Sequence, residues 1–296
     1  MYPFSITTFS LTQEITLPLR ELSNSLTQEL DSVIQYNGEC SAVVHRLLNH
    51  YFQVDATNFI LNPLVSISPM VQKKLLNAIS RLKKHEPIQY VIGEAYFAGK
   101  IFKVTPDVLI PRVETEEWVN FLINKVSLPT SILDIGTGSG CIAITLKRAF
   151  PQALVTAIDV SKEALKVARY NAVQLDAEVD FIEMNMLAEQ LPTHHWPLIV
   201  SNPPYIRIQE RHLMQRNVID YEPHLALFVD DPDPLLFHRR IVHFAMHHLN
   251  LNGLLCLEIN EALGKKVVDL LQYSNFRQVS LHKDIHGKER WVMATL

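Results

Sequence analysis

Two kinds of hydrophobic spacing divide the chain. From about residue 12 to residue 84, apolar residues recur three and four positions apart, which is typical of one face of a helix. The clearest runs are Val43, Val44, Leu47 and Leu48, and then Val71, Leu75, Leu76, Ile79 and Leu82. Ser68 followed by Pro69 indicates a helix start. Because this stretch shows no strand-like alternation, it predicts a small all-helical domain over residues 1–86.

The pattern changes after Glu86-Pro87. Residues 96–104 contain two short β-rich runs around a glycine, which predicts a hairpin within a linker over residues 87–112. A helix is then expected over residues 114–126, and Pro129 marks the break before the next strand.

From residue 131 onward, strand-like and helix-like runs alternate, as in a doubly wound parallel sheet of the α/β class. Strands are expected at residues 132–135, 155–158, 181–184, 198–200 and 254–259, with helices that include 141–149 and 162–175. Residues 278–281 and 290–295 flank a Gly287 turn, which predicts a closing antiparallel hairpin. Residues 113–296 are therefore expected to form a Rossmann-like domain.

The composition fits a folded protein of two domains, since 48% of the 296 residues are hydrophobic and 20% are charged. The three cysteines are widely spaced and form no CxxC pair, which is typical of a protein in a reducing compartment. We expect them to be small residues of the core. The chain lacks the long apolar run of a membrane span and the features of a secretory signal. We expect a cytoplasmic monomer that does not bind membranes. The net charge of −4 also counts against a nucleic-acid partner.

A glycine loop follows the first strand of the predicted sheet. Gly136, Thr137, Gly138, Ser139 and Gly140 stand between that strand and a helix, where glycines let the backbone approach a ligand closely. Asp159 ends the next strand, and a carboxylate there accepts hydrogen bonds from ribose hydroxyls. These features predict an adenosine-type cofactor.

Two details favour S-adenosylmethionine over a nicotinamide dinucleotide. The third glycine comes two residues after the second rather than three, and Asp134 precedes the loop. A carboxylate at that place would repel a pyrophosphate, but it suits a ligand that carries an ammonium and a sulfonium.

The run Asn202, Pro203, Pro204 and Tyr205 follows the apolar strand at 198–200. Both prolines fix φ and restrict the residue before them, so the loop is stiff and presents carbonyl groups. The Asn202 oxygen and the Pro203 carbonyl can each accept one N–H of a planar NH₂ group, which aims the nitrogen lone pair at a methyl donor. Tyr205 can stack on the flat group. This loop predicts methyl transfer to an amide or an exocyclic amine, without an assigned general base.

The same residues resemble the amino-methyltransferases with an Asn-Pro-Pro-Tyr motif, which act on adenine, cytosine or protein glutamine. The runs from Glu86 to Gly93 and from Val108 to Glu116, together with Tyr221-Glu222-Pro223, look like the signature of the HemK-type release-factor glutamine methyltransferases. The resemblance covers about residue 86 to the C-terminus and, more weakly, the helical domain. It implies methylation of the glutamine in the Gly-Gly-Gln motif of peptide chain release factors, with the helical domain docking the factor.

The resemblance also implies roles for individual residues. The loop from Gly136 to Gly140, with Asp159, Asn185, Met186 and Asn202, would contact the cofactor. Asn202, Pro203, Pro204 and Tyr205 would hold the glutamine, and Arg112, Glu114, Thr115 and Glu116 would border the site.

At four positions the chain departs from the family pattern. Asn185 replaces a usual aspartate near the adenine, and Met186 replaces an aromatic residue and offers a softer contact. Val113 replaces a proline, and Asn260 replaces a glycine.

Two alternative functions remain open at the level of the sequence. The loop from Asn202 to Tyr205, called the acceptor loop below, also permits by itself the methylation of an exocyclic amine on DNA or RNA. A second alternative is a binding protein that keeps the fold without catalysis, which the intact Asn202 and glycine loop oppose. His243 and His247, four apart, and the pair His194 and His195 raise the question of a metal site, but no HExxH pattern accompanies them. We therefore predict no metal.

Overall fold

The computed structural model describes residues 6, 9, 11–34, 39–188 and 194–296, which divide into two compact units. The smaller comprises Met1–Gly93 with Arg216–Tyr221, and the larger comprises Glu94–Gln215 with Glu222–Leu296. The domain limits at residues 86 and 112 stay predictions. The smaller unit reaches Gly93 because Ile88 and Val91 of α5 are buried in its core.

The smaller unit is built mainly of helices, as the three- and four-residue spacing predicts. They are α1 (Leu19–Leu30), α2 (Glu39–Phe52), α3 (Ala56–Leu61), α4 (Pro69–Leu82), α5 (Ile88–Ile92) and α9 (Arg216–Tyr221). Leu26, Leu47 and Leu75 are fully buried where α1, α2 and α4 meet. The Ser68 hydroxyl accepts from the Val71 N–H with Pro69 in the first turn, so the predicted start of α4 is confirmed.

The prediction that this region is entirely helical is wrong in one respect. Two short strands, β1 (Ile15–Pro18) and β2 (Leu64–Ile67), pair antiparallel, with Ile15 opposite Ile67. Each strand has only four residues and finds its partner some fifty positions away, so neither gives a local alternating pattern. The buried Gln72 amide donates to the carbonyls of Gln13 and Ile67, which fastens the sheet to α4.

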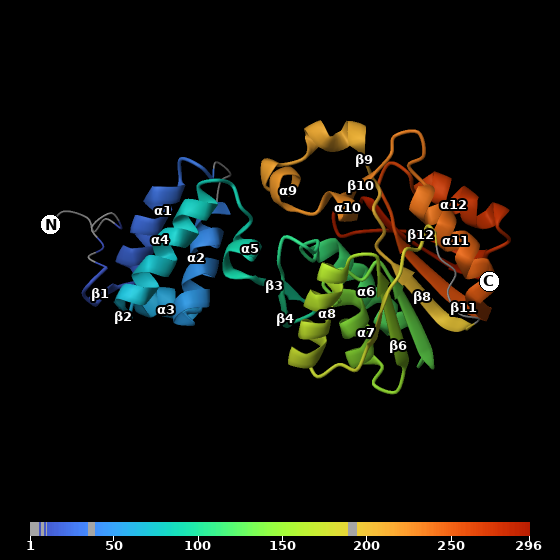
Figure 1. Cartoon of the computed structure of the whole chain (residues 1–296), viewed down its shortest axis with the longest axis horizontal. Coiled ribbons are helices and arrows are strands. Elements are labelled where there is room, and N and C mark those ends of the chain that lie inside the picture. Colours follow the sequence, from blue (N-terminus) through green and yellow to red (C-terminus); the bar gives the residue numbers. More distant parts are fainter. Residues whose placement is uncertain (1–5, 7–8, 10, 35–38, 189–193) are drawn as a thin grey trace. The chain divides into compact units, whose positions relative to one another are not determined.

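The larger unit contains a twisted, mostly parallel sheet (Figure 1). In the described part of the chain its seven strands lie in the order β12-β13-β11-β8-β5-β6-β7. They are β5 (Ser131–Ile135), β6 (Leu154–Asp159), β7 (Asp180–Glu183), β8 (Trp196–Ser201), β11 (Leu249–Glu258), β12 (Arg277–Lys283) and β13 (Glu289–Thr295). β13 runs antiparallel to both β11 and β12. The predicted doubly wound sheet and its closing hairpin are confirmed.

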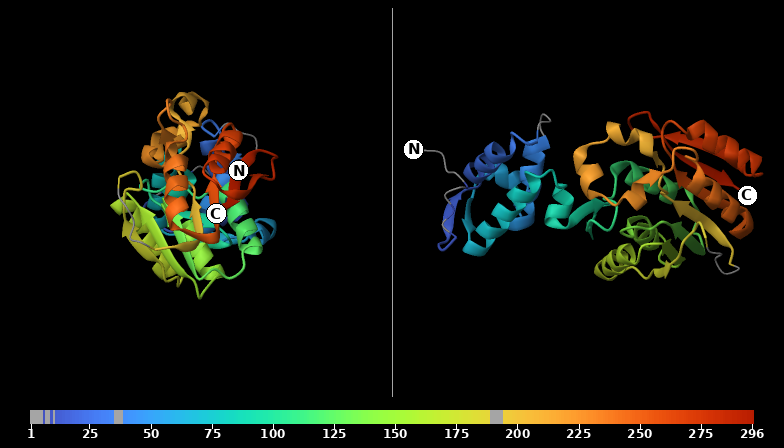
Figure 2. Two further views of the ribbon diagram at one scale, coloured as in Figure 1. Left: turned by 90° about the vertical axis from the view of Figure 1, so that its right-hand side faces the viewer. Right: turned by 45° about the horizontal axis from the view of Figure 1, so that its top comes forward.

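Helices cover both faces of this sheet (Figure 2). One face carries α6 (Val113–Lys125), α7 (Cys141–Ala149) and α8 (Lys162–Gln174), and the other carries α11 (Leu236–His248) and α12 (Gly264–Tyr273). Side chains of a strand point alternately to its two faces, so Ile132 joins the core under α6 to α8 and Leu133 the core under α11 and α12. Because both faces are buried, the central strands consist mostly of apolar residues.

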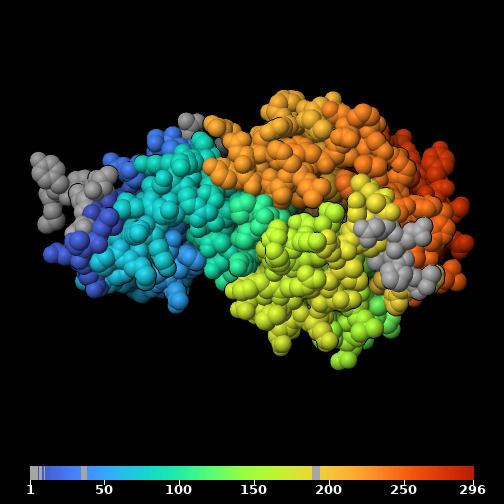
Figure 3. Space-filling view, viewed as in Figure 1, coloured from blue at the N-terminus to red at the C-terminus, as the bar shows by residue number. Residues whose placement is uncertain are grey.

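Two smaller segments complete the larger unit. The predicted hairpin is confirmed as β3 (Glu94–Phe97) and β4 (Lys100–Lys103), with Ala98 and Gly99 at positive φ in the turn. After β8, the chain forms β9 (Ile206–Arg207), the 3₁₀ helix η2 (Ile208–Leu213), α10 (His224–Leu227) and β10 (Phe228–Val229). In Figure 3 the gold and orange atoms of residues after β8 lie along one edge of the larger unit.

Two predictions about composition can be compared with the structure. Cys40, Cys141 and Cys256 are buried free thiols, as expected of small core residues. Burial raises the pKa of the Cys141 thiol to about 12, which makes it a poor nucleophile. Among the described helices, none is long and apolar enough to cross a membrane.

Candidate active site

The winding direction of the sheet reverses between β5 and β8. β6 and β7 lie to one side of β5, while β8 and β11 lie to the other. Loops that leave two such strands diverge, and a crevice opens at their carboxyl ends. Ile135 is paired with Ser201, whose hydroxyl donates to the Ile135 carbonyl at 2.7 Å. Gly136 and Asn202 therefore start adjacent loops. Methyl transfer requires this proximity, because the glycine loop is expected to bind the methyl donor and the loop from Asn202 to Tyr205 is expected to hold the NH₂ group.

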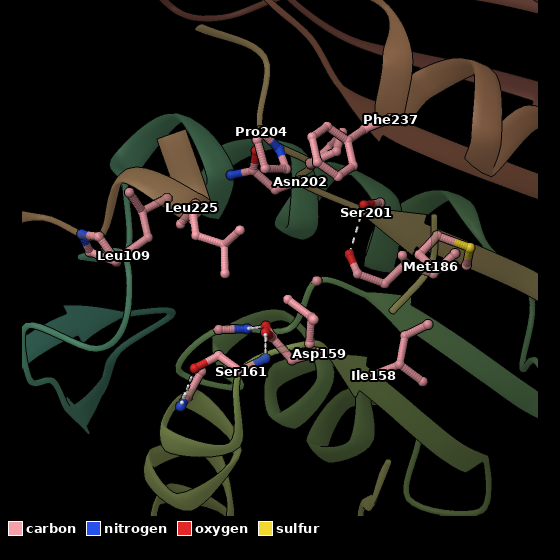
Figure 4. A pocket seen from close by; sticks show the side chains of 18 of the residues that line it. Leu109, Ile158, Asp159, Ser161, Met186, Ser201, Asn202, Pro204, Leu225 and Phe237 are labelled. Carbon is pink, nitrogen blue, oxygen red and sulfur yellow. Dashed lines mark hydrogen bonds between the residues drawn. The ribbon is translucent and has the colours of Figure 1, made fainter. Parts of the chain in front are cut away.

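A cavity of about 950 Å³, including its open mouth, lies at this crevice. Figure 4 shows Asp159 and Ser161 on one side of it, with Asn202 and Pro204 on the opposite side. Its lining comes from the ends of four strands, the segment before α6, the segment after β8 and helices α8 and α11. The lining residues are Asp107, Val108, Leu109, Ile135, Gly136, Gly138, Ile158, Asp159, Val160, Ser161, Ala164, Met184, Asn185, Met186, Ser201, Asn202, Pro203, Pro204, Pro223, Leu225, Ala226, Phe237 and Ile241.

The glycine loop presents only some of its predicted residues to the cavity. Gly136 and Gly138 line it at φ of +75° and +55°, and a Cβ on either would meet no protein atom within 4 Å. Gly140, also at positive φ, instead packs against α7 and α8, where a Cβ would lie 2.9 Å from Ile144 Cδ1. The side chains of Thr137 and Ser139 are buried beneath the loop. Gly136 and Gly138 thus offer backbone to a ligand, whereas the other three shape the loop.

Asp159 is held at the cavity by backbone donors. Its Oδ2 accepts from the Gly138 N–H at 2.8 Å, and its Oδ1 accepts from the Ser161 N–H at 2.9 Å. Burial raises the pKa of this carboxyl, and the backbone N–H groups oppose that effect. Each carboxylate oxygen keeps a second lone pair, so Asp159 can still accept hydrogen bonds from two hydroxyls.

Asn185 and Met186 lie at the cavity wall after β7. Their contact with an adenine stays a prediction. The Asn185 Oδ1 accepts from the Leu187 N–H at 3.0 Å, and Arg240 Nε donates to the Met186 carbonyl at 2.8 Å. Met186 is 7% exposed and lies against an apolar wall with Ile158 and Ile241. An apolar slot beside a carboxylate fits the flat base and the ribose of an adenosine.

Asp134 lies behind the loop rather than in the cavity lining. It is fully buried, and its Oδ2 accepts from the Thr137 hydroxyl at 2.7 Å. Burial raises the pKa of its carboxyl to about 7. Any attraction to a cationic ligand therefore acts through the loop and depends on ionisation near neutral pH.

Asn202, Pro203 and Pro204 line the cavity. The Asn202 Nδ2 donates to the Thr115 hydroxyl at 3.2 Å, so the carboxamide oxygen is left to accept from a ligand. Tyr205 is not among the described lining residues, because its hydroxyl donates to Glu258 Oε1 at 2.9 Å. The stacking role predicted for Tyr205 stays a prediction.

Two residues near the acceptor loop bind buried carboxylates, and sequence reasoning gave neither a role. Thr115 donates to Glu258 Oε2 at 2.6 Å. Arg112 Nη2 donates to Glu222 Oε1 at 2.6 Å, and the Ile110 N–H also reaches Glu222. Only the resemblance pointed to these positions, since the paired residues lie more than a hundred positions apart in the sequence.

Several further lining residues were missed by the sequence analysis. Leu109, Leu225 and Phe237 give the cavity an apolar wall opposite Asp159 (Figure 4). Nothing in the pattern around Phe237 distinguishes it from an ordinary core position. Among the described residues, no three potential metal ligands come together. His243 and His247 contact each other through their rings on α11.

Two protein-family models match this chain. Residues 115–224 match the Methyltransferase small domain family, and residues 18–93 match the PrmC N-terminal domain family. The catalytic domain of hMettl16, solved with the MAT2A 3'UTR hairpin 1, has a TM-score of 0.50 at 19% identity. That similarity covers 66% of this chain and 73% of the other, and it shows a shared fold.

Two curated relatives are much closer in sequence. The release factor glutamine methyltransferase of Flavobacterium psychrophilum is 41% identical, over 93% of this chain and 98% of the relative. The one from Bacteroides thetaiotaomicron is 44% identical over 81% and 87% of the two chains. The chain belongs to the family of release factor glutamine methyltransferases, enzymes that use S-adenosylmethionine as methyl donor.

Proposed function

We propose that this protein methylates the side-chain amide nitrogen of the glutamine in the Gly-Gly-Gln motif of peptide chain release factors. The observation that carries the proposal is the position of Asn202 and Pro203 beside the glycine loop. Both ends of the reaction, the methyl donor and the amide, then share one cavity. Bound S-adenosylmethionine supplies an electrophilic methyl group on its sulfonium.

The cofactor would bind in the part of the cavity that the glycine loop, Asp159 and Met186 line. The backbone at Gly136 and Gly138, the Asp159 carboxylate and the wall at Met186 are the groups that would hold it. Asp159 would accept from the ribose hydroxyls, while Met186 would contact the base. Thr137, Ser139 and Gly140 contribute by holding the loop in shape.

Asn202 and Pro203 orient the amide that receives the methyl group. An amide nitrogen is a poor nucleophile because its lone pair is delocalised into the carbonyl. The Asn202 Oδ1 accepts one N–H and the Pro203 carbonyl accepts the other, so the lone pair points toward the cofactor. Positive charge grows on the nitrogen during transfer, and both acceptors stabilise it more than they stabilise the ground state. The methylated nitrogen is acidic and loses its proton to water.

A methyl-transfer assay tests this function. Purified release factor, its glutamine-to-alanine variant and DNA are each incubated with labelled S-adenosylmethionine and the protein. Label is expected in the unmodified factor alone. Asn202→Ala should lower kcat by roughly a hundredfold or more, whereas Asn124→Ala, an exposed amide on α6, should not. Label in DNA but not in the factor would replace the proposal with the nucleic-acid alternative.

The remaining part of the proposal concerns the setting of the reaction. We infer a cytoplasmic monomer that meets the release factor directly and needs no nucleic acid. The net charge of −4 and the three buried free thiols support this inference. Sedimentation of the protein alone and with release factor would reveal any larger assembly.

A further inference from the structure

The carboxylate of Glu258 connects the two ends of the acceptor loop. Glu258 is 1% exposed and ends β11, next to β8 in the sheet. Leu257 is paired with Ser201, so Glu258 lies beside the start of the acceptor loop at Asn202. Its Oε1 accepts from the Tyr205 hydroxyl, while its Oε2 accepts from Thr115 at 2.6 Å.

The donors around Glu258 decide which way the Thr115 hydroxyl points. The Trp118 indole donates to Oε2 at 2.8 Å, and an indole N–H cannot accept in return. Oε2 accepts from both groups, because the Thr115 hydroxyl donates its single proton to Oε2 at 2.6 Å. The Thr115 oxygen is left only with lone pairs, so the group facing it on Asn202 must be a donor.

That constraint fixes the carboxamide of Asn202. The Nδ2 faces Thr115 at 3.2 Å, which leaves the Oδ1 as the acceptor for a cavity ligand. A carboxamide turned by 180° would present its own NH₂ to the substrate NH₂, and both groups are donors. Nitrogen and oxygen have nearly the same size, so shape alone does not prevent this flip.

We propose that Glu258 is a positioning residue that acts through Thr115 to keep the Asn202 oxygen toward the substrate amide. The proposal deepens the function proposed above and rests on it for the identity of the substrate. A carboxylate that also holds Tyr205 keeps the intervening Pro203 carbonyl in place. Glu258 thus positions both acceptors without contacting either substrate.

A pair of variants at Thr115 separates hydrogen bonding from packing. Thr115→Val keeps the shape but removes the hydroxyl, and Thr115→Ser keeps the hydroxyl but removes a methyl group. Thr115→Val is expected to lower kcat by roughly tenfold or more, with little change in KM for the release factor. Thr115→Ser should retain kcat within about threefold. Equal losses in the two variants would overturn the proposal.

A second pair tests Glu258 itself. In Glu258→Gln the donors Trp118 and Thr115 select the amide oxygen, and the amide NH₂ can face the Tyr205 oxygen. The Glu258→Gln variant should therefore keep most of its kcat, whereas the kcat of Glu258→Leu should fall to that of Thr115→Val. Thermal unfolding and affinity for S-adenosylhomocysteine identify any variant that has lost its fold. Full activity in a folded Glu258→Leu protein would contradict the proposal.

One measurement is independent of the substrate. The side-chain NH₂ of Asn202 should exchange slowly with solvent in the NMR spectrum of the S-adenosylhomocysteine complex, because Thr115 accepts from it. Exchange should become at least about tenfold faster in Thr115→Val but not in Thr115→Ser. An unchanged exchange rate of the Asn202 side-chain NH₂ in Thr115→Val would contradict the inference. If wild-type protein fails to methylate any release factor while the exchange pattern holds, the proposed function fails and the positioning role stands.

Discussion

Gly138 and Gly140 have positive φ for different reasons, and alanine at each should reveal the difference. At Gly140 a Cβ would lie 2.9 Å from Ile144 and 3.2 Å from Ala168. Gly140→Ala should lower the free energy of unfolding by about 1–3 kcal/mol. At Gly138 a Cβ meets no protein atom but enters the cavity lining. Gly138→Ala should weaken S-adenosylhomocysteine binding by roughly tenfold, with a smaller loss of stability.

Chemical denaturation and calorimetric titration of both variants check this contrast. The order of the two stability losses is the sensitive result. If Gly138→Ala destabilises the protein as much as Gly140→Ala while its binding is intact, then Gly138 does not face the ligand.

Asp134 should make the stability of the protein depend on pH in an unusual direction. Burial raises the pKa of its carboxyl from 3.8 to about 7. Between these values the folded state holds a proton that the unfolded state has released, so this group's contribution to stability falls as pH rises and levels off above pH 7. Asp134→Asn removes the charge but keeps an oxygen for Thr137. It should stabilise the protein at pH 8 by roughly 2–4 kcal/mol.

Urea denaturation at pH 5 and pH 8 measures this effect. The variant should gain roughly a third as much stability relative to wild type at pH 5 as at pH 8, because the carboxyl of the unfolded wild type is already ionised at pH 5. A gain that is equal at both pH values would show that Asp134 is already ionised at pH 5.

The residues of the site differ in how far the sequence alone reveals them. Asn202 and Gly136 are recognisable because each follows a strand and belongs to a short motif with a chemical reason. Glu258 and Thr115 are 143 positions apart, and only the pairing of β11 with β8 brings Glu258 beside the acceptor loop. A polar side chain at the end of an apolar strand was the available signal, but it does not name its partner.

At the level of elements, the hydrophobic pattern of the sequence predicts a helix or strand best where a whole face of that element is buried. β5 and α7 were predicted within a residue because β5 is buried throughout and the first six residues of α7 are buried in the sheet core. The segment after β8 gave no clear prediction. Its β9 and β10 have two residues each, and its short helices bury only one side chain among their described residues, Leu227. Such elements form because neighbouring elements position them, so their own sequence carries little periodicity.

This segment is fastened to the rest of the larger unit by Glu222. The Glu222 side chain is 1% exposed and pairs with Arg112 Nη2 at 2.6 Å, just before Pro223, Leu225 and Ala226 line the cavity. Removing one partner of a buried pair leaves an uncompensated charge. Arg112→Ala should therefore loosen residues 222–229 and raise KM for the release factor several-fold.

Hydrogen exchange over residues 222–229 and steady-state kinetics test the role of this pair. Lys162→Ala is a suitable control because its ion pair with Glu183 is exposed and contributes little. Arg112→Ala with unchanged exchange in this segment would show that Glu222 does not hold it.

At the scale of the whole molecule, the two units divide the work unequally. In the part of the chain that the structure describes, every residue that lines the cavity belongs to the larger unit. No described residue of the smaller unit lines the cavity, although this unit accounts for about a third of the chain. A role in docking a large substrate, as the sequence resemblance implies, gives it a function consistent with this separation.

Exposed apolar side chains on the smaller unit provide a test of docking. Ile60 and Leu61 at the end of α3 are 73% and 71% exposed, so glutamate at both positions should cost little stability. If this surface docks the release factor, the double variant should raise KM for the intact factor by roughly tenfold. The same variant should methylate a short glutamine peptide at the wild-type rate, because a peptide reaches only the cavity. Leu154→Glu, equally exposed at the start of β6, should affect neither substrate. Equal loss with factor and peptide would place the effect on the cavity rather than on docking.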